Sequence, residues 1–155
     1  MTPQQFNAVM APVIDAVAGK PVDGSLESTL NRAFPADGPV VGAIEKACHE
    51  AIEAGWMCAQ GKPGRKYGRV IEATPASRDL SVDVVDLVDI VGPHHVHPNG
   101  EVCLVLPVTP AAKFMGNGRG WCCYGAGSDH HPTVSGGRAL VLYLLPGGKI
   151  EFTGR

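Results

Sequence analysis

The chain has 155 residues, of which 45% are hydrophobic and 18% are charged, and its formal net charge is −2 at pH 7. This length and composition predict one globular domain that buries a core without disulfide or metal staples. The 13 basic residues form no run or patch, which argues against nucleic acid as a partner. No apolar stretch is long enough to span a bilayer and the first residues lack the features of a secretory signal, so we expect no membrane partner.

The first 62 residues have helical periodicity. Apolar side chains recur every three to four positions from Phe6 to Val17, and Pro39 is typical of a first helical turn. Three helices are expected, over residues 3–18, 26–34 and 39–57. We expect this segment, residues 1–62, to pack on the rest of the chain, and its apolar faces favour a homodimer.

Residues 63–155 have a β-like pattern, with frequent Gly and Pro between short Val-, Leu- and Tyr-rich runs. Strands are expected over residues 66–73, 80–91, 94–97, 101–107, 121–124, 131–134, 139–145 and 150–153. Many short strands without intervening helices predict a sandwich or barrel. The expected fold class is therefore mainly β, a small jelly-roll-like β-barrel with the helical segment packed on it in one compact domain.

The chain contains five cysteines, an odd number without the spacing of a zinc ribbon or a disulfide framework. They are Cys48, Cys58, Cys103, Cys122 and Cys123. We expect reduced and mostly buried thiols in a cytoplasmic protein.

Residues 92–101, Gly-Pro-His-His-Val-His-Pro-Asn-Gly-Glu, carry the most informative pattern. On a strand, His95 and His97 point to the same side. The turn signal at residues 98–100 is expected to reverse the chain into a hairpin and bring Glu101 beside both histidines. Two imidazoles and one carboxylate around a shared point make a facial triad, which suits Fe²⁺ and also Mn²⁺ or Zn²⁺.

A second histidine cluster follows the Gly-rich residues 125–127 and can supply a fourth ligand. His130 and His131 are neighbours, so a strand sends them to opposite faces and only one of them should bind the ion. His131 is therefore the competing candidate. His94 immediately precedes the first pair and should face away from the site.

These motifs resemble those of the cupin superfamily. The pattern His95-x-His97-x-x-x-Glu101 is similar to the first cupin motif, and Gly127-x-x-His130 is similar to the core of the second. The resemblance implies a cupin-type β-barrel in which His95, His97, Glu101 and His130 hold one divalent metal ion. The departures concern residues that shape turns rather than bind metal, and they fall at Val108, Gly125 and Val134.

A wider resemblance covers nearly the whole chain, through residues 92–101, 120–121, 127–134 and 136–152. These stretches look like a bacterial family of small proteins that includes the 4-hydroxylaminobenzoate lyases of nitroaromatic degradation. The resemblance implies conversion of 4-hydroxylaminobenzoate to protocatechuate (3,4-dihydroxybenzoate) and ammonia, with Glu101 and His95 as catalytic residues.

Such a substrate carries a carboxylate and an aromatic ring, and both need binding groups. An arginine can hold a carboxylate with two parallel hydrogen bonds, and an aromatic side chain can stack on the ring. The candidate substrate-binding residues are Tyr67, Arg69, Arg119, Trp121, Tyr124 and Arg138. Tyr67 and Arg69 are expected to share one face of a strand, although each candidate also has a structural explanation.

Two further patterns predict structural roles. Asp83, Asp86 and Asp89 recur every third residue and cannot share one strand face, so we expect solvated or edge positions. The Gly136-Gly137 pair predicts a turn.

Two alternative functions use the same residues. An Fe²⁺ dioxygenase acting on a small aromatic or thiol substrate would need the same ligands, and oxygen consumption would distinguish it. A non-catalytic cupin that binds a small molecule would show binding without turnover.

Overall fold

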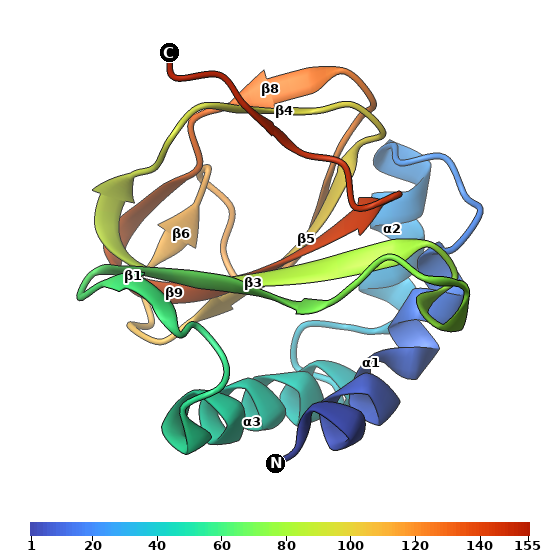
Figure 1. Ribbon diagram of the computed structural model, residues 1–155, viewed down its shortest axis with the longest axis horizontal. Coiled ribbons are helices and arrows are strands. Elements are labelled where there is room, and N and C mark those ends of the chain that lie inside the picture. The colour runs from blue at the N-terminus through green and yellow to red at the C-terminus, as the bar shows by residue number, and fades with distance from the viewer.

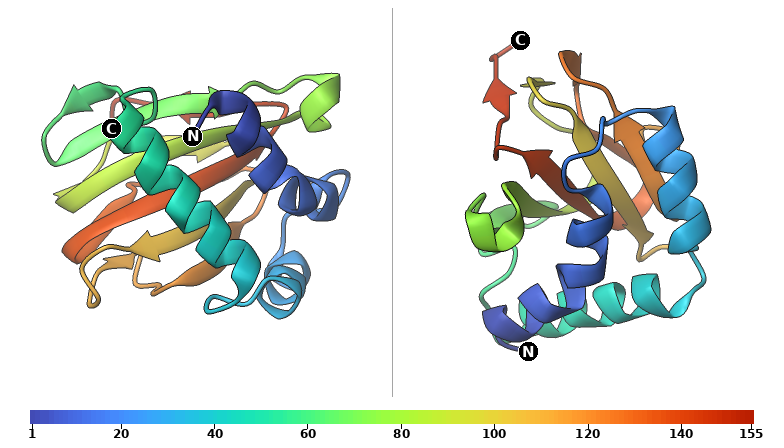
Figure 2. Two further views of the ribbon diagram at one scale, coloured as in Figure 1. Left: turned by 90° about the horizontal axis from the view of Figure 1, so that it is seen from below. Right: turned by 90° about the vertical axis from the view of Figure 1, so that its right-hand side faces the viewer.

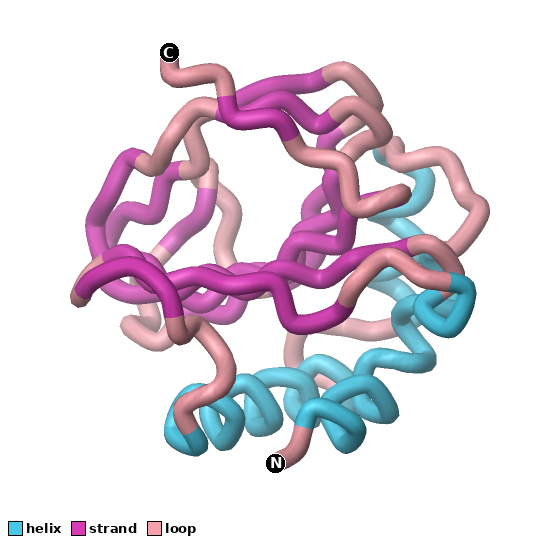
Figure 3. The backbone as a smooth tube through the Cα atoms, in the orientation of Figure 1, coloured by secondary structure: helices cyan, strands magenta, loops and turns pink.

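The computed structural model describes all residues from 1 to 155, which form a helical layer packed on a β-rich body (Figure 1). The helices are α1 (Pro3–Val17), α2 (Gly24–Ala33) and α3 (Pro39–Ala54). They cover the lower and right-hand outside of the strands in the view of Figure 3. None of them is long and apolar enough to cross a lipid bilayer.

The β-rich body contains two sheets that face each other across the barrel. Its strands are β1 (Gln60–Lys62), β2 (Arg65–Ile71), β3 (Leu80–Val91), β4 (His95–His97), β5 (Glu101–Pro107), β6 (Lys113–Phe114), β7 (Gly120–Tyr124), β8 (Ser128–His130), β9 (Thr133–Pro146) and β10 (Glu151–Phe152). The larger sheet follows the order β1-β2-β3-β9-β5-β7, with β6 also paired to β9, and the smaller sheet is β10-β4-β8. The mainly β fold with helices packed outside the barrel, as predicted, is confirmed.

Local capping sets the helix boundaries. At the start of α1, the Gln5 amide donates to Thr2 Oγ1 at 3.1 Å and the Thr2 amide donates to Gln5 Oε1 at 2.8 Å. At the start of α2, Asp23 accepts the Leu26 amide at 3.0 Å. The third helix ends at Gly55, whose φ of 91° lies in the left-handed region that favours glycine. Each helix therefore ends slightly earlier than predicted.

The larger sheet buries both of its faces. On β5, Val102 and Leu104 pack toward the helices, whereas Cys103 and Val105 pack inside the barrel. Figure 2 shows α1 and α3 crossing the outer face of this sheet. Because both faces of β5 are buried, that strand is a nearly continuous apolar run after Glu101, and both β3 and β5 have the bounds predicted from the sequence.

The Gly136-Gly137 pair does not form the predicted turn, because both residues lie within the long strand β9. Their φ angles are 77° and 125°, and a Cβ on Gly137 would lie 2.5 Å from the Thr109 hydroxyl oxygen. Glycine lets the strand bend past the loop that contains Thr109. The two strands expected at 131–134 and 139–145 are consequently parts of one strand.

The prediction for the aspartates of β3 was wrong for Asp83 and Asp86, whereas Asp89 is exposed as predicted. Asp83 pairs with Arg69 at 2.7 Å, and Asp86 pairs with Arg138 at 2.9 Å. Asp89 accepts a backbone amide of β9 at 3.0 Å. Since β3 lies between β2 and β9 rather than at an edge, its polar side chains meet partners on the neighbouring strands.

We expect the helices and the barrel to unfold together, because one cluster of buried side chains contains residues of both. Leu30 of α2 is fully buried in this cluster. Replacing it by alanine should lower the free energy of unfolding by about 2–5 kcal/mol. The exposed neighbour Ser28 is the matched control, and Ser28→Ala should change that free energy by less than about 0.5 kcal/mol. Urea unfolding followed by circular dichroism and by tryptophan fluorescence should give one coincident transition. Two separate transitions would contradict a single folding unit.

Candidate metal centre

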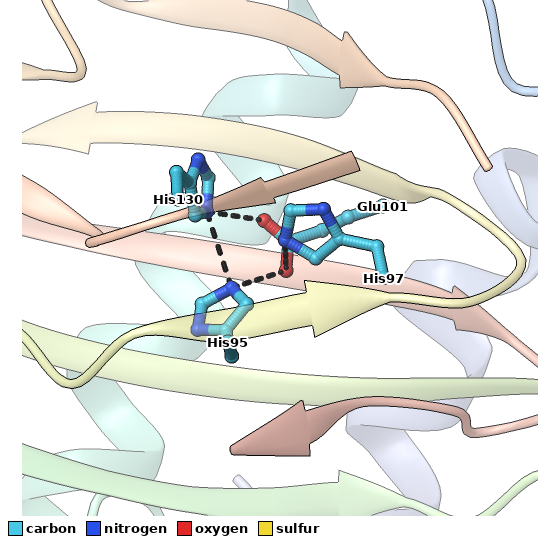
Figure 4. A group of neighbouring side chains, drawn as sticks. All are labelled: His95, His97, Glu101 and His130. Atoms are coloured by element: carbon cyan, nitrogen blue, oxygen red, sulfur yellow. Dashed lines mark hydrogen bonds and ion pairs between the residues drawn. The ribbon is translucent and has the colours of Figure 1, made fainter. Parts of the chain in front are cut away.

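Four side chains from three strands point toward one another inside the barrel, as Figure 4 shows. His95 and His97 are alternate residues of β4 and therefore share one side of that strand. Glu101 is the first residue of β5, and His130 is the last residue of β8. His130 lies directly opposite His95 in the pairing of β8 with β4.

The turn at residues 98–100 is present, but it does not form the predicted hairpin. The Gly100 amide donates to the His97 carbonyl at 3.1 Å. Gly100 has a φ of 92°, and a Cβ there would lie 2.7 Å from Val22 Cβ. Because β4 pairs with β8 and β10 while β5 pairs with β7 and β9, the turn carries the chain from the small sheet to the large one. Glu101 thus meets the histidines across the barrel and not across a strand pair.

The distances between the four side chains match those of a metal ligand set. The Nε2 atoms of His95 and His130 are 3.1 Å apart, and those of His95 and His97 lie 3.2 Å and 3.0 Å from Glu101 Oε2. His130 Nε2 lies 3.5 Å from Glu101 Oε1. Ligands about 2.1 Å from a shared ion are about 3.0 Å apart at right angles and about 3.4 Å apart in a tetrahedron. The four ligand atoms therefore surround a point at which one ion fits.

The orientation of the polar atoms also indicates a cation. His97 Nε2 and Glu101 Oε2 are fully buried, yet neither has a hydrogen-bond partner of acceptable geometry although they lie only 3.0 Å apart. Burying such groups without a partner is costly, whereas lone pairs that converge on a cation are compensated. Three imidazole nitrogens and one carboxylate suit Fe²⁺, Mn²⁺ or Zn²⁺. The cluster thus has the donor set and the burial of a site for one divalent ion.

Ser128 fixes the orientation of one imidazole. Its hydroxyl donates to the Gly125 carbonyl oxygen, so its oxygen is free to accept the Nδ1–H of His97 at 2.9 Å. Neutral His97 then carries its proton on Nδ1 and presents the Nε2 lone pair to the other ligands.

Glu101 is held in its ionised form by the three histidines. Burial alone would raise the pKa of this carboxyl group, but the close imidazoles of His130, His95 and His97 bring the pKa well below its ordinary value. The Cys103 thiol donates to Glu101 Oε1 at 3.1 Å. The carboxylate is therefore anionic at neutral pH, as a metal ligand must be.

The two histidines next to the cluster in the sequence, His94 and His131, have other partners. His94 Nε2 lies 2.6 Å from Asp129 Oδ2, on the outer side of the small sheet, and so faces away from the cluster as predicted. His131 Nδ1 lies 3.2 Å from the Gly92 carbonyl oxygen. Of the two neighbouring histidines, His130 is the one that joins the cluster.

A cavity of about 450 Å³ lies beside the cluster, and His95 is the one residue of the cluster that lines it. Its walls include the apolar side chains of Val85, Leu87, Pro93, Pro132, Ile150 and Phe152. Of the sequence candidates, Tyr67 and Arg69 line this cavity. The structure thus brings two of the predicted substrate-binding residues to the same space as a metal ligand.

The other sequence candidates lie in different places. The ring of Tyr124 packs against the ring of His130, with centroids 4.7 Å apart, so it borders the cluster. Trp121 packs with the helices on the opposite face of the sheet, and its Nε1 donates to the Phe34 carbonyl at 3.0 Å. Arg119 is paired with Glu45 of α3 at 2.6 Å. Arg138 lines a separate pocket with Asp86 and Val88, on the opposite face of β3, which leaves Arg69 as the only candidate arginine at the cavity.

Two residues of the cavity wall were not identified from the sequence. Tyr143 has a buried hydroxyl without a hydrogen-bond partner, and its ring centroid is 6.1 Å from that of His95. Arg65 lines the same cavity. Tyr143 is the only residue with a polar side-chain group in the apolar run 139–145, which is the one signal that the sequence contained.

Comparisons with known proteins agree with the motif resemblance. A family model described as PnbB, 4-hydroxylaminobenzoate lyase, matches residues 8–152. A protein named 4-hydroxylaminobenzoate lyase from Nocardioides sp. (strain LMS-CY) is 27% identical over 161 residues, covering 97% of this chain and 95% of that protein. One of the same name from Pseudomonas putida is 24% identical over 153 residues, covering 88% of this chain and 87% of that protein.

Solved structures with some likeness to this chain include cupins. An RmlC-like cupin protein from Ralstonia eutropha aligns with 61% of this chain and 62% of its own, with a TM-score of 0.45 and 12% identity. A salicylate 1,2-dioxygenase from Pseudaminobacter salicylatoxidans aligns with 72% of this chain and 37% of its own, with a TM-score of 0.34 and 13% identity.

The neighbouring histidines provide a matched test of the ligand set. Natively purified protein should contain one divalent ion per chain, measured by elemental analysis. His130→Ala removes a ligand and should weaken metal binding by more than roughly tenfold in a competition titration with a coloured chelator. His131→Ala should leave the affinity unchanged, because that ring faces the Gly92 carbonyl. Wild-type affinity in His130→Ala would contradict the proposed set.

Proposed function

This chain belongs to the 4-hydroxylaminobenzoate lyase family, and we propose that it converts 4-hydroxylaminobenzoate and water to protocatechuate and ammonia. The observation that carries the proposal is the position of the four-residue cluster beside a cavity with apolar walls. His95 belongs to the cluster and also lines that cavity. A volume of about 450 Å³ is in the range of small-molecule pockets and holds one substituted benzene ring.

The proposed reaction needs no external oxidant or reductant. The N–O bond of the hydroxylamino group breaks and its oxygen leaves as water. One water molecule then adds to a ring carbon beside the carbon that bears nitrogen, and a second replaces the nitrogen, which leaves as ammonia when the C–N bond breaks. Reduction at nitrogen balances oxidation of the ring, and the net consumption is one water molecule. The protein must therefore bind the ring, supply protons to the leaving oxygen and nitrogen, and accept protons from the water molecules that add.

His95, His97, Glu101 and His130 would hold the divalent ion. When bound, the ion would supply a Lewis acid for the hydroxylamino oxygen, or lower the pKa of a water molecule. His95 is the ligand that also lines the cavity, so a bound ring would meet the centre at this residue. We assign the proton relay to Glu101, whose carboxylate is ionised and buried among the three imidazoles.

Tyr143 is the wall residue best placed to give a proton. Burial, and then the charge of Glu101, raises the pKa of its hydroxyl well above the ordinary value, so the group stays protonated. Its hydroxyl has no partner within the protein and is therefore free to donate to a ligand. In the proposal it donates to the hydroxylamino oxygen, which leaves as water when the N–O bond breaks.

The proposal includes a cytoplasmic homodimer as the working form. All five cysteines are free, and four of them are buried, which suits a reducing compartment. Size-exclusion chromatography with light scattering would give the mass in solution.

Removal of the ion is the first test of the function. Wild-type protein should release ammonia and protocatechuate from 4-hydroxylaminobenzoate, lose that activity after dialysis against a chelator, and recover it with one specific divalent ion. His131→Ala is the control variant and should behave as wild type throughout. Full activity in metal-free protein would remove the metal from the mechanism, and stoichiometric oxygen uptake would indicate a dioxygenase instead.

Tyr143→Phe tests the proton donor. The substitution removes one hydroxyl group and should lower kcat by about 100-fold or more, while KM changes little, because the donor acts on the leaving oxygen. Tyr67→Phe removes a hydroxyl from an exposed ring of the same cavity and should leave kcat close to wild type. An unchanged kcat in Tyr143→Phe would show that another group protonates the leaving oxygen.

A further inference from the structure

We infer that Arg65 recognises a carboxylate on the aromatic substrate and so makes the cavity selective for aromatic acids. This inference rests on the proposed function, because it assigns the group that binds the far end of the substrate ring. The argument starts from the charges that face the cavity.

Three side chains with a permanent charge line the cavity: Arg65, Arg69 and Asp83. Arg69 is already engaged, since its Nε and Nη2 lie 2.7 Å and 3.4 Å from the two carboxylate oxygens of Asp83. Its Nη2 also donates to the Gly148 carbonyl at 3.2 Å. The two charges cancel, and the bidentate edge of the Arg69 guanidinium is occupied.

Arg65 has no such partner. No hydrogen bond or ion pair joins its side chain to another residue, and its guanidinium carbon lies 5.4 Å from the centre of the Tyr67 ring. This contact with an aromatic face orients the guanidinium without using its N–H groups. The cavity therefore carries one uncompensated positive charge, with donors arranged for bidentate binding of a carboxylate.

The strand pattern places this charge within reach of the cavity. Arg65, Tyr67 and Arg69 alternate along β2 and share one face of it. Arg65 pairs with Leu87 of β3, whereas Tyr143 pairs with Asp83, four residues along the same strand. Four residues span about 13 Å along β3, and the two strand spacings from β2 to β9 add about 10 Å across it, so the Cα atoms of Arg65 and Tyr143 lie about 16 Å apart. A para-substituted ring and the two side chains can together span that distance.

The cavity walls between Arg65 and Tyr143 include apolar side chains that can contact an aromatic ring. Val85 and Leu87 of β3 lie on one side, and Ile150 and Phe152 of the C-terminal segment also line the space. An aromatic acid can therefore place its ring between apolar side chains, its carboxylate at Arg65 and its para substituent toward Tyr143 and the metal ligands. A neutral ring of the same shape would lack the charge-assisted contact.

The test uses two unreactive probes of equal shape, 4-hydroxybenzoate and 4-hydroxybenzamide, with binding measured by calorimetry on the metal-loaded protein. Wild type should bind the acid more tightly than the amide. Arg65→Gln should raise the Kd of the acid roughly 10- to 100-fold and leave that of the amide unchanged. Arg65→Lys should lie between the two, because the charge remains and the bidentate fork is lost.

Two control variants separate this role from general effects of charge. Arg32→Gln changes an exposed arginine on α2 and should leave both Kd values unchanged. The double variant Arg69→Gln/Asp83→Asn removes both partners of the neighbouring ion pair and should keep the preference for the acid. Loss of the preference in this double variant, with Arg65→Gln behaving as wild type, would assign the carboxylate to Arg69 and overturn the inference.

Failure of the inference can be distinguished from failure of the proposed function. If wild type releases ammonia from 4-hydroxylaminobenzoate but Arg65→Gln binds the acid probe as wild type does, only the inference fails. If wild type shows Arg65-dependent binding of the acid but releases no ammonia, the cavity selects aromatic acids and the lyase proposal fails. Equal weakening of acid and amide in Arg65→Gln would also overturn the inference, because it would indicate a change in cavity shape.

Discussion

The convergence of three imidazoles and one carboxylate inside the barrel is the constraint on which the rest of the structure depends. His95, His97 and Glu101 are fully buried, and the His130 side chain is only 7% exposed. Four polar groups at this depth are tolerated only if something satisfies their lone pairs. A shared divalent cation would do so, and it would tie the small sheet to the large one. The cluster would then couple the closure of the barrel to the chemistry of the proposed site.

The large sheet supports this arrangement because its central strands are largely buried on both faces. One face packs on the helices and the other forms the barrel interior, so the central strands β3, β9 and β5 have little freedom to shift register. The pairs of Asp83 with Arg69 and Asp86 with Arg138 join neighbouring strands of the same sheet. Charged side chains that seemed available for substrate are consequently structural, and the unpaired Arg65 is the exception.

Much of the fold and of the ligand set could be predicted from the sequence. The family resemblance is confirmed by the match over residues 8–152, and β3 and β5 have the predicted bounds because segments rich in Val and Leu are clear strand signals. The strands β1, β6 and β8 were not predicted. Each has only two or three residues, which is too short for an alternating pattern to be recognised.

The sequence by itself determined the ligand types and their local geometry, since the spacing of His95 and His97 fixes a shared strand face. Only the tertiary structure decided how Glu101 reaches them, because the turn at residues 98–100 leads into a different sheet and not into a hairpin. It also decided that His130 and not His131 joins the cluster, and which arginine remains unpaired at the cavity. These outcomes depend on contacts between residues far apart in the chain, such as Arg69 with Asp83 and Arg119 with Glu45, and local spacing carries no information about them.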